Sequence, residues 1–432
     1  MNQPRTNQWR RLDNAAKIFP PTSTRRDPKV FRFSCCLSEN VDPAVLRLAL
    51  DQTIRQFPFF CAVLRKGLFW YYLEDLKIRP QVLPEYKPPC SEIYRGDHKD
   101  LLFEITYFGR RVNLEIYHAL ADGTGALLFL RTLILYYLKE KYPDALAGQS
   151  LSINYDAAEG DKRDDSFSKY YSGKGETKLS REPAAYRLRG YRLPDCRLRV
   201  ISGRLSVRQL LDEAHRYGAT LTEYLTAQLM LSIHDGMSVR DKKRPVVINV
   251  PVDLRQFFPS QSARNFFAII NIKYDFLNHP ACLEDLIPSV RASFKKKLTM
   301  ERISAKLDNL LALERNPFMR AVPLMLKVPI LKLANYISER HYTATFSNLG
   351  RVLMPDAASP YIEYFDVFNS TKGVQACSCS FGDNFLISFT SPFDQSDLQC
   401  RFFRRLSAAG LAVEISSNLD QTQKEVGGDA SL

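Results

Sequence analysis

The sequence of 432 residues has no run of eighteen apolar residues, so it offers no candidate for a membrane-spanning helix. Its opening, MNQPRTNQWRRLDNAAKIFP, is polar and lacks the apolar core of a signal peptide, so we expect no secretory leader. No zinc finger, RNP-type strand or other nucleic-acid module is present, and neither is a sequence repeat or a low-complexity tract. These absences favour a globular cytoplasmic protein that does not bind nucleic acid.

Cysteine gives no sign of a disulfide framework or a metal site. The nine cysteines are scattered and odd in number. Cys377 and Cys379 are separated by one residue, which is too close for a zinc knuckle, and no histidine stands beside them. We therefore expect reduced thiols, as in the cytosol, and no bound metal.

Composition and charge set broader bounds. The chain is long for a single core, so two domains are expected. The formal net charge is +13. Its candidate partners are nucleic acid, an anionic membrane surface, an acidic carrier protein or a phosphorylated cofactor. The basic residues are spread out, and their densest stretches are 181–208, 240–244 and 295–297. A solvated basic surface without a partner is the simplest alternative.

The most informative stretch is a predicted hairpin followed by a helix. Two extended runs, 101–108 and 111–118, are separated only by Gly109-Arg110, which suits a tight antiparallel turn. Side chains alternate between the two faces of a strand. One face of the second strand therefore carries Val112, Leu114, Ile116 and His118.

His118 consequently ends a strand on its apolar side. The turn-prone ADGTG follows, with Asp122 four residues after the histidine, and then apolar residues recur at helical spacing to about Lys141. A lone histidine on an apolar face is commonly a satisfied core residue. The spacing His118-x-x-x-Asp122-Gly123 at a strand-to-loop junction favours a positioned base instead.

The remaining chain alternates between strand-like and helix-like segments. Strands are predicted at 29–37, 59–63, 67–73, 197–205, 244–252, 266–274, 343–348, 375–390 (turning at 382–384) and 412–416. Helices are predicted at 42–57, from 206, and at 222–234, 283–313 and 396–409. Residues 316–337 are the most apolar segment, but two prolines and several cations make them a poor spanning helix. A helix packed on the body is favoured there, and an interfacial amphipathic segment is the alternative.

A second group of polar residues lies at the end of the predicted strand 244–252 and just after it. The sequence NVPVDLR contains Asn249, Asp253 and Arg255, and Asn265 follows ten residues later. Alone, the Asp and Arg would be a solvated loop pair. Together with the HALADG of residues 118–123, however, they resemble the CoA-dependent acyltransferase superfamily. This superfamily includes chloramphenicol acetyltransferase, the plant BAHD acyltransferases, bacterial alcohol acetyltransferase-like proteins and the condensation domains of peptide synthetases.

Further matches and departures refine the resemblance, which spans residues 9 to about 400. The strand end TFSNLG, with Ser347 and Asn348, and the opening WRRLDNAAKIFP are similar to the bacterial alcohol acetyltransferase-like branch. Condensation domains usually carry a second histidine where this chain has Tyr117, which disfavours carrier-protein condensation. The plant DFGWG element is absent, so the bacterial branch is preferred.

The resemblance implies an α/β fold of two similar chloramphenicol acetyltransferase-like halves. Each half would contain a mixed sheet with helices, and a tunnel between them would hold His118 at its middle. We expect the first half at 1–147, a linker at 148–195, the second half at 196–418 and a disordered tail at 419–432.

The resemblance also implies the chemistry. His118 would act as general base while an alcohol or amine attacks an acyl-CoA thioester, with no acyl-enzyme, metal or bound cofactor. Asp122 would pair with Arg255 and hold the turn, and the Ser347 hydroxyl would stabilise the oxyanion. The other supporting positions are Gly123, Asn249, Asp253, Asn265 and Asn348.

Two alternatives remain open at this stage. One is a carrier-protein-dependent condensation-like module of a natural-product or lipid pathway, or a non-catalytic relative. The other is a basic protein that binds anionic lipid or DNA and consumes no thioester. Membrane-surface contact is the less favoured partner. The sequence specifies neither the acyl length, the acceptor, the CoA phosphate site nor the oligomeric state.

Overall fold

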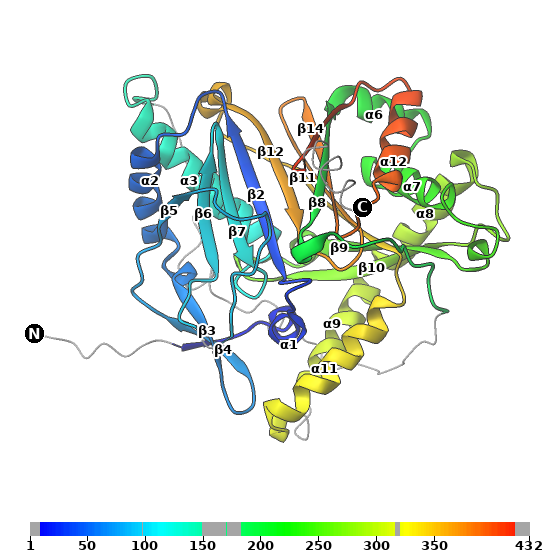
Figure 1. The fold of residues 1–432 in the computed structure, drawn as a ribbon, viewed down its shortest axis with the longest axis horizontal. Coiled ribbons are helices and arrows are strands. Elements are labelled where there is room, and N and C mark those ends of the chain that lie inside the picture. The colour runs from blue at the N-terminus through cyan, green and yellow to red at the C-terminus, as the bar shows by residue number, and fades with distance from the viewer. Residues whose placement is uncertain (1–8, 97, 149–169, 171–182, 316–319, 420–432) are drawn as a thin grey trace, which may run out of the picture.

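The computed structural model describes residues 9–96, 98–148, 170, 183–315 and 320–419. Most of the predicted linker and nearly all of the predicted tail lie outside these residues. The described chain forms a five-stranded sheet, a seven-stranded sheet and a small three-stranded sheet, together with helices (Figure 1). The predicted α/β class with mixed sheets is therefore confirmed.

The five-stranded sheet forms the centre of the first half. Its strand order is β12-β2-β7-β6-β5, and its elements are β2 (Val30–Leu37), β5 (Val82–Pro84), β6 (Phe103–Phe108), β7 (Arg111–Tyr117) and β12 (Ile362–Asn369). The predicted hairpin is present, with Gly109 in its turn at a φ of 54°, a left-handed conformation that glycine adopts readily. Helices α2 (Pro43–Gln56) and α3 (Gly123–Lys141) lie together on the outer side of the sheet (Figure 1).

The seven-stranded sheet forms the centre of the second half, in the order β10-β9-β11-β13-β14-β8-β15. Its strands are β8 (Arg199–Ser206), β9 (Val246–Asp253), β10 (Phe267–Tyr274), β11 (Ala344–Arg351), β13 (Gln375–Phe381), β14 (Asn384–Ser391) and β15 (Glu414–Ser417). Its helices are α6 (Val207–Arg216), α7 (Leu221–His234), α8 (Leu283–Lys297), α9 (Met300–Arg315) and α12 (Asp397–Ala408). The one long helix predicted at 283–313 is thus two helices, separated near Leu298.

One strand does not follow the order of the chain. Although β12 comes late in the sequence, it pairs antiparallel with β2 of the first half, for example Phe365 opposite Cys35. The residue ranges predicted for the two halves therefore do not coincide with the two sheets at this strand. The pairing of β12 with β2 also fixes the second half against the first through backbone hydrogen bonds.

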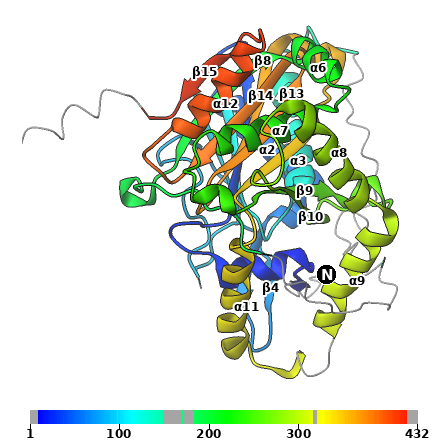
Figure 2. The same cartoon turned by 90° about the vertical axis from the view of Figure 1, so that its right-hand side faces the viewer.

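A third, smaller region lies at one end of the molecule. It contains the three-stranded sheet of β1 (Trp9–Arg11), β4 (Tyr71–Asp75) and β3 (Ala62–Lys66), the short helix α1 (Phe19–Thr22), and helix α11 (Leu324–Glu339). Helix α11 packs against α1, and Figure 2 shows the two side by side. Across the described residues, no helix is both long and apolar enough to cross a bilayer.

Candidate functional site

A cavity of about 960 Å³ lies where residues of both halves meet. Its walls include Phe31 and Phe33 of β2, the start of α3, the end of β9, and parts of α8, β11, β12 and β13. Of the nine predicted site residues, the lining contains His118, Asp122, Gly123, Asp253, Ser347 and Asn348. Arg255 and Asn265 touch these residues from behind the cavity wall. Asn249 is buried within β9, opposite Asn271 of β10, and does not belong to the lining.

His118 immediately follows the last residue of β7, and aromatic rings fix its imidazole. Its backbone N–H donates to the carbonyl of Lys29 at 2.8 Å. The ring of Phe19 stacks on the imidazole at 4.5 Å between centroids, and Phe31 meets it edge-on at 4.9 Å. Phe31 lies opposite Ile116 in the β2–β7 pair, so the imidazole lies on the predicted apolar face.

A short hydrogen-bond chain determines which nitrogen of the imidazole carries the proton. The Asn265 amide nitrogen donates to the His118 carbonyl at 3.1 Å and to the Asp13 carboxylate at 3.3 Å, and both of these groups can only accept. The Asn265 oxygen must therefore be the atom 3.1 Å from Nδ1 of His118, and Nδ1–H donates to it. The neutral ring consequently keeps its free lone pair on Nε2.

The surroundings of His118 also favour the neutral ring energetically. Burial lowers the pKa of the imidazole below its ordinary range, although the bond to its own carbonyl, the charge of Asp122 and the bond with Asn265 oppose that shift. A lowered pKa means that the imidazole is a base, rather than a cation, at neutral pH. This is the protonation state that proton abstraction requires.

Asp122 joins the two halves through its hydrogen bonds. Its carboxylate caps α3 by accepting from the Gly125 N–H at 3.0 Å. Its second oxygen accepts from Arg255 Nη1 at 2.8 Å and from the Phe266 N–H at 2.9 Å. The predicted ion pair is therefore present, and the side chains of Asp122 and Arg255 are 6% and 12% exposed.

Arg255 uses all of its guanidinium N–H groups in this arrangement. Nη1 also donates to Asp253 at 2.9 Å, while Nε and Nη2 donate to the carbonyls of Ser262 and Arg264 at 2.7 to 3.1 Å. Burial alone would lower the pKa of Arg255, but the charges of Asp122 and Asp253 raise it overall. The guanidinium is thus a permanent cation that fixes the loop before β10 to the turn after His118.

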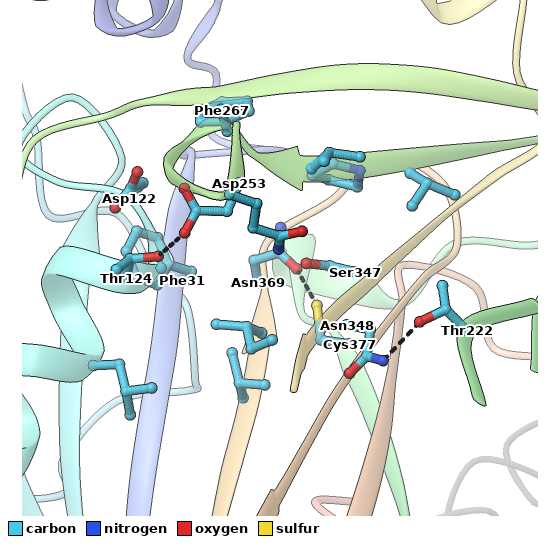
Figure 3. Close-up of a pocket in the computed structure, with 18 of the residues that line it drawn as sticks. Phe31, Asp122, Thr124, Thr222, Asp253, Phe267, Ser347, Asn348, Asn369 and Cys377 are labelled. Atoms are coloured by element: carbon cyan, nitrogen blue, oxygen red, sulfur yellow. Dashed lines mark hydrogen bonds between the residues drawn. The ribbon is translucent and has the colours of Figure 1, made fainter. Parts of the chain in front are cut away.

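Polar groups of the second half line the other side of the cavity (Figure 3). Ser347 lies on β11 opposite Cys377 of β13. The next residue, Asn348, donates to Thr222 at 2.9 Å and accepts from the Gly350 N–H at 3.0 Å. Asn348 therefore holds the strand end, whereas the Ser347 hydroxyl lies on the wall that also contains Asn369.

Several residues of the site were not singled out from the sequence. Phe19, Asp13 and Gly125 are the main ones. The first two belong to the opening RRLDNAAKIFP, whose resemblance to the bacterial branch was the available signal. Gly125 is required by close packing, since a Cβ there would lie 1.9 Å from the carbonyl oxygen of Ala263. Only glycine allows the loop of the second half to approach α3 this closely.

Tyr117 stands at the position where condensation domains usually carry a second histidine. Its side chain is fully buried, its hydroxyl lies 2.8 Å from that of Ser23, and it does not line the cavity. Burial raises the pKa of this phenol well above its ordinary value. As for metals, no group of three or more His, Cys, Asp or Glu side chains within the described ranges could hold an ion.

No family model and no curated protein matches the sequence, but solved structures resemble the fold. The trichothecene 15-O-acetyltransferase TRI3 from Fusarium sporotrichioides has 12% identity and a TM-score of 0.60, over 93% of this chain and 94% of that one. TRI101 from F. sporotrichioides, complexed with coenzyme A and T-2, has 11% identity and a TM-score of 0.60, over 94% and 99%.

A condensation domain resembles this chain equally well. The first condensation domain of the calcium-dependent antibiotic synthetase, in complex with a substrate analogue, has 14% identity and a TM-score of 0.60, over 94% of this chain and 97% of that one. Acetyltransferases and condensation domains both belong to the superfamily that the sequence resembles. The predicted fold is therefore confirmed over nearly the whole chain.

Proposed function

We propose that this chain is an acyltransferase that moves an acyl group from acyl-CoA to an alcohol or amine. One observation carries the proposal. The imidazole of His118 lies in the wall of a large cavity between the two halves, and Asn265 occupies Nδ1, so Nε2 is the nitrogen available to a substrate. A neutral base fixed in one tautomer suits proton abstraction from an attacking acceptor.

The reaction follows from this geometry. Nε2 takes the proton as the acceptor oxygen or nitrogen attacks the thioester carbonyl, whose π electrons move onto its oxygen. The Ser347 hydroxyl then donates to this oxyanion. When the intermediate collapses, the carbon–sulfur bond breaks and the imidazolium returns the proton to the sulfur. The products are an ester or amide and free CoA thiol, and no acyl-enzyme forms.

Further features support acyl-CoA as the donor and an alcohol as the acceptor. TRI3 is an O-acetyltransferase by its name, and TRI101 was solved with coenzyme A. At position 117, where many condensation domains have a histidine, this chain has a tyrosine that does not line the cavity. The excess of positive charge would suit the phosphates of CoA. We also propose that the cavity extends as a tunnel, with the donor entering from one side and the acceptor from the other.

A second candidate is a condensation-like enzyme that takes its acyl group from a carrier protein, because condensation domains share the fold equally well. The two readings differ in the donor alone. Thiol release should be measured with acyl-CoA and, separately, with the same acyl group on a carrier protein. Turnover of acyl-CoA supports the first candidate, whereas turnover restricted to the carrier supports the second.

The experiment that tests the base is the His118→Ala variant. We expect thiol release in the presence of alcohols or amines to fall by roughly 10²–10⁴-fold, the usual contribution of a positioned base. Binding of acyl-CoA should change little, because the base contacts the acceptor's proton. The exposed His279 provides the matched control, since His279→Ala removes the same group from a residue that does not line the cavity.

The variant must also be shown to fold. His118 packs against Phe19 and Phe31, so His118→Asn, which can still donate to Asn265, serves as a second substitution. Both variants should keep the circular dichroism spectrum of the parent. If a folded variant releases thiol as fast as the parent, His118 is a structural residue and the proposed activity loses its support.

A further inference from the structure

Helix α11 presents an apolar face to solvent. Leu324 and Lys327 are the buried residues of the helix. Six large apolar residues of the same helix are 48–78% exposed: Met325, Leu326, Ile330, Leu333, Tyr336 and Ile337. At 100° per residue their directions fall within an arc of about 140°, so they form one continuous stripe.

The tip of the β3–β4 hairpin extends this stripe. Leu68 is 72% exposed and Phe69 is 40% exposed. The tip touches the beginning of α11, where the Leu324 N–H donates to the carbonyl of Leu68 at 2.8 Å. Together the stripe and the tip form what we call the α11 face. It covers on the order of several hundred Å², which is at the upper end of what a soluble monomer exposes.

The opposite side of α11 is firmly attached to the body. The ammonium group of the buried Lys327 lies 3.7 Å from the centre of the Trp70 ring and donates to the carbonyl of Phe69 at 3.1 Å. Burial, followed by the charge of Lys17, lowers the pKa of Lys327. The helix also packs on α1, as Figure 2 shows. Because its inner side is fixed in this way, the outer face is presented permanently.

Cations flank the α11 face. Lys66 stands beside the hairpin tip, and Arg320, Lys332 and Arg340 lie before, within and after the helix; all four are exposed. Between residues 320 and 340 the sequence has four basic residues and one acidic residue. That acid, Glu339, pairs with Lys372 at 3.0 Å. An apolar stripe bordered by cations is the pattern of a helix that lies in the surface of an anionic bilayer.

We propose that the α11 face docks this protein onto an anionic lipid bilayer. With 16 residues the helix is about 24 Å long, shorter than the hydrocarbon core, so it would lie in the interface rather than cross it. A second copy of the chain suits the face less well. A twofold contact would place the cations of both copies around one interface, where like charges repel. The proposal concerns binding alone and does not depend on the proposed activity.

The test is flotation of the purified full-length chain with lipid vesicles. Vesicles of phosphatidylcholine with about a third phosphatidylglycerol should carry the protein upward, and pure phosphatidylcholine vesicles should carry much less. Raising the salt to about 1 M should weaken binding, because the Debye length falls to about 3 Å. The double variant Ile330→Glu/Leu333→Glu should lower the affinity for anionic vesicles by ~10²-fold or more, since two apolar side chains no longer enter the bilayer interface.

A matched control separates this face from general hydrophobicity. Val239 and Leu277 are 85% and 60% exposed on the second half, and Val239→Glu/Leu277→Glu adds the same charge there. This control should float like the parent, and both double variants should keep its circular dichroism spectrum. The proposal is overturned if the parent does not bind anionic vesicles or if the α11 variant binds as well as the control. It is also overturned if size exclusion shows a dimer that only the α11 variant dissociates, because the face would then be an interface between copies.

Discussion

Breaking the ion pair between Asp122 and Arg255 should destabilise the fold and also lower the rate of turnover. The pair is buried, and it joins the turn after His118 to the loop before β10. Asp122→Asn removes the charge but keeps the size of the side chain. We expect a loss of folding free energy together with a loss of turnover, since the same turn positions the imidazole.

The magnitude follows from the hydrogen bonds. The Asp122 carboxylate accepts three N–H groups through two oxygens, whereas an asparagine has one accepting oxygen. At least one donor therefore faces an NH₂ group. A lost charge-assisted bond of about 1.5–3 kcal/mol and an unsatisfied donor of about 1–3 kcal/mol add up to ~2.5–6 kcal/mol. This range brackets the ~3–5 kcal/mol that removing one partner of a buried ion pair usually costs. Arg255→Met should cost more, because it strands both Asp122 and Asp253.

Denaturant unfolding measures this difference better than heating does. Unfolding entropy of about 2.1 cal/mol/K per residue amounts to ~0.9 kcal/mol/K for this chain, so 4 kcal/mol shifts the melting temperature by only ~4 °C. The control is Glu414→Gln, which breaks an exposed pair with Arg204 and should cost at most ~1 kcal/mol. If Asp122→Asn costs no more than this control, the reasoning about the buried pair is wrong.

Three further outcomes can be checked by thiol release or by denaturant unfolding. Thiol release should rise with pH and level off with a midpoint below about 6.5, because the neutral imidazole is the active form and burial lowers the pKa of His118; a midpoint above that value would exclude His118 as the base. Ser347→Ala should cut turnover by up to ~10²-fold with an unchanged denaturation midpoint, whereas unchanged turnover would remove the hydroxyl from the mechanism. Gly125→Ala should lower the free energy of unfolding, measured with denaturant, by ~1–3 kcal/mol or more, since the added Cβ would meet a backbone oxygen. Gly373→Ala is the control, because open space surrounds its Cβ; equal stability of the two variants would contradict the close packing at Gly125.

Local sequence signals predicted most of the individual elements. The predicted segments 42–57 and from 206 begin at Asp42 and Ser206, which cap α2 and α6 with a side-chain oxygen that accepts from a backbone N–H. Helix α7 begins one residue before the predicted start at 222, because Thr220 caps it in the same way. These bonds span three residues or fewer, so the sequence alone can reveal them. The hairpin before His118 was predictable for the same reason, because Gly109 supplies the turn and the flanking strands alternate.

Contacts between distant parts of the chain were not predictable in this way. Strand β12 pairs with β2 across more than three hundred residues, and the segment IEYFDVFN carries no feature that distinguishes one sheet from the other. The contacts of Asn265 with His118 and Asp13 likewise join residues 147 and 252 positions apart. The resemblance named Asp122 and Arg255 as a pair, but only the structure shows that Asn265 determines the tautomer of His118.

These long-range contacts place the groups that hold the proposed base, His118, in the half that does not contain it. His118 belongs to the first half, yet Asn265, which holds its Nδ1, belongs to the loop before β10 of the second half. The same loop accepts the guanidinium of Arg255 through its carbonyls, and Arg255 in turn holds Asp122. Separating the halves would therefore free the imidazole and expose an ion pair in one step. A change that loosens their contact should weaken both catalysis and stability, even where it touches no atom of a substrate.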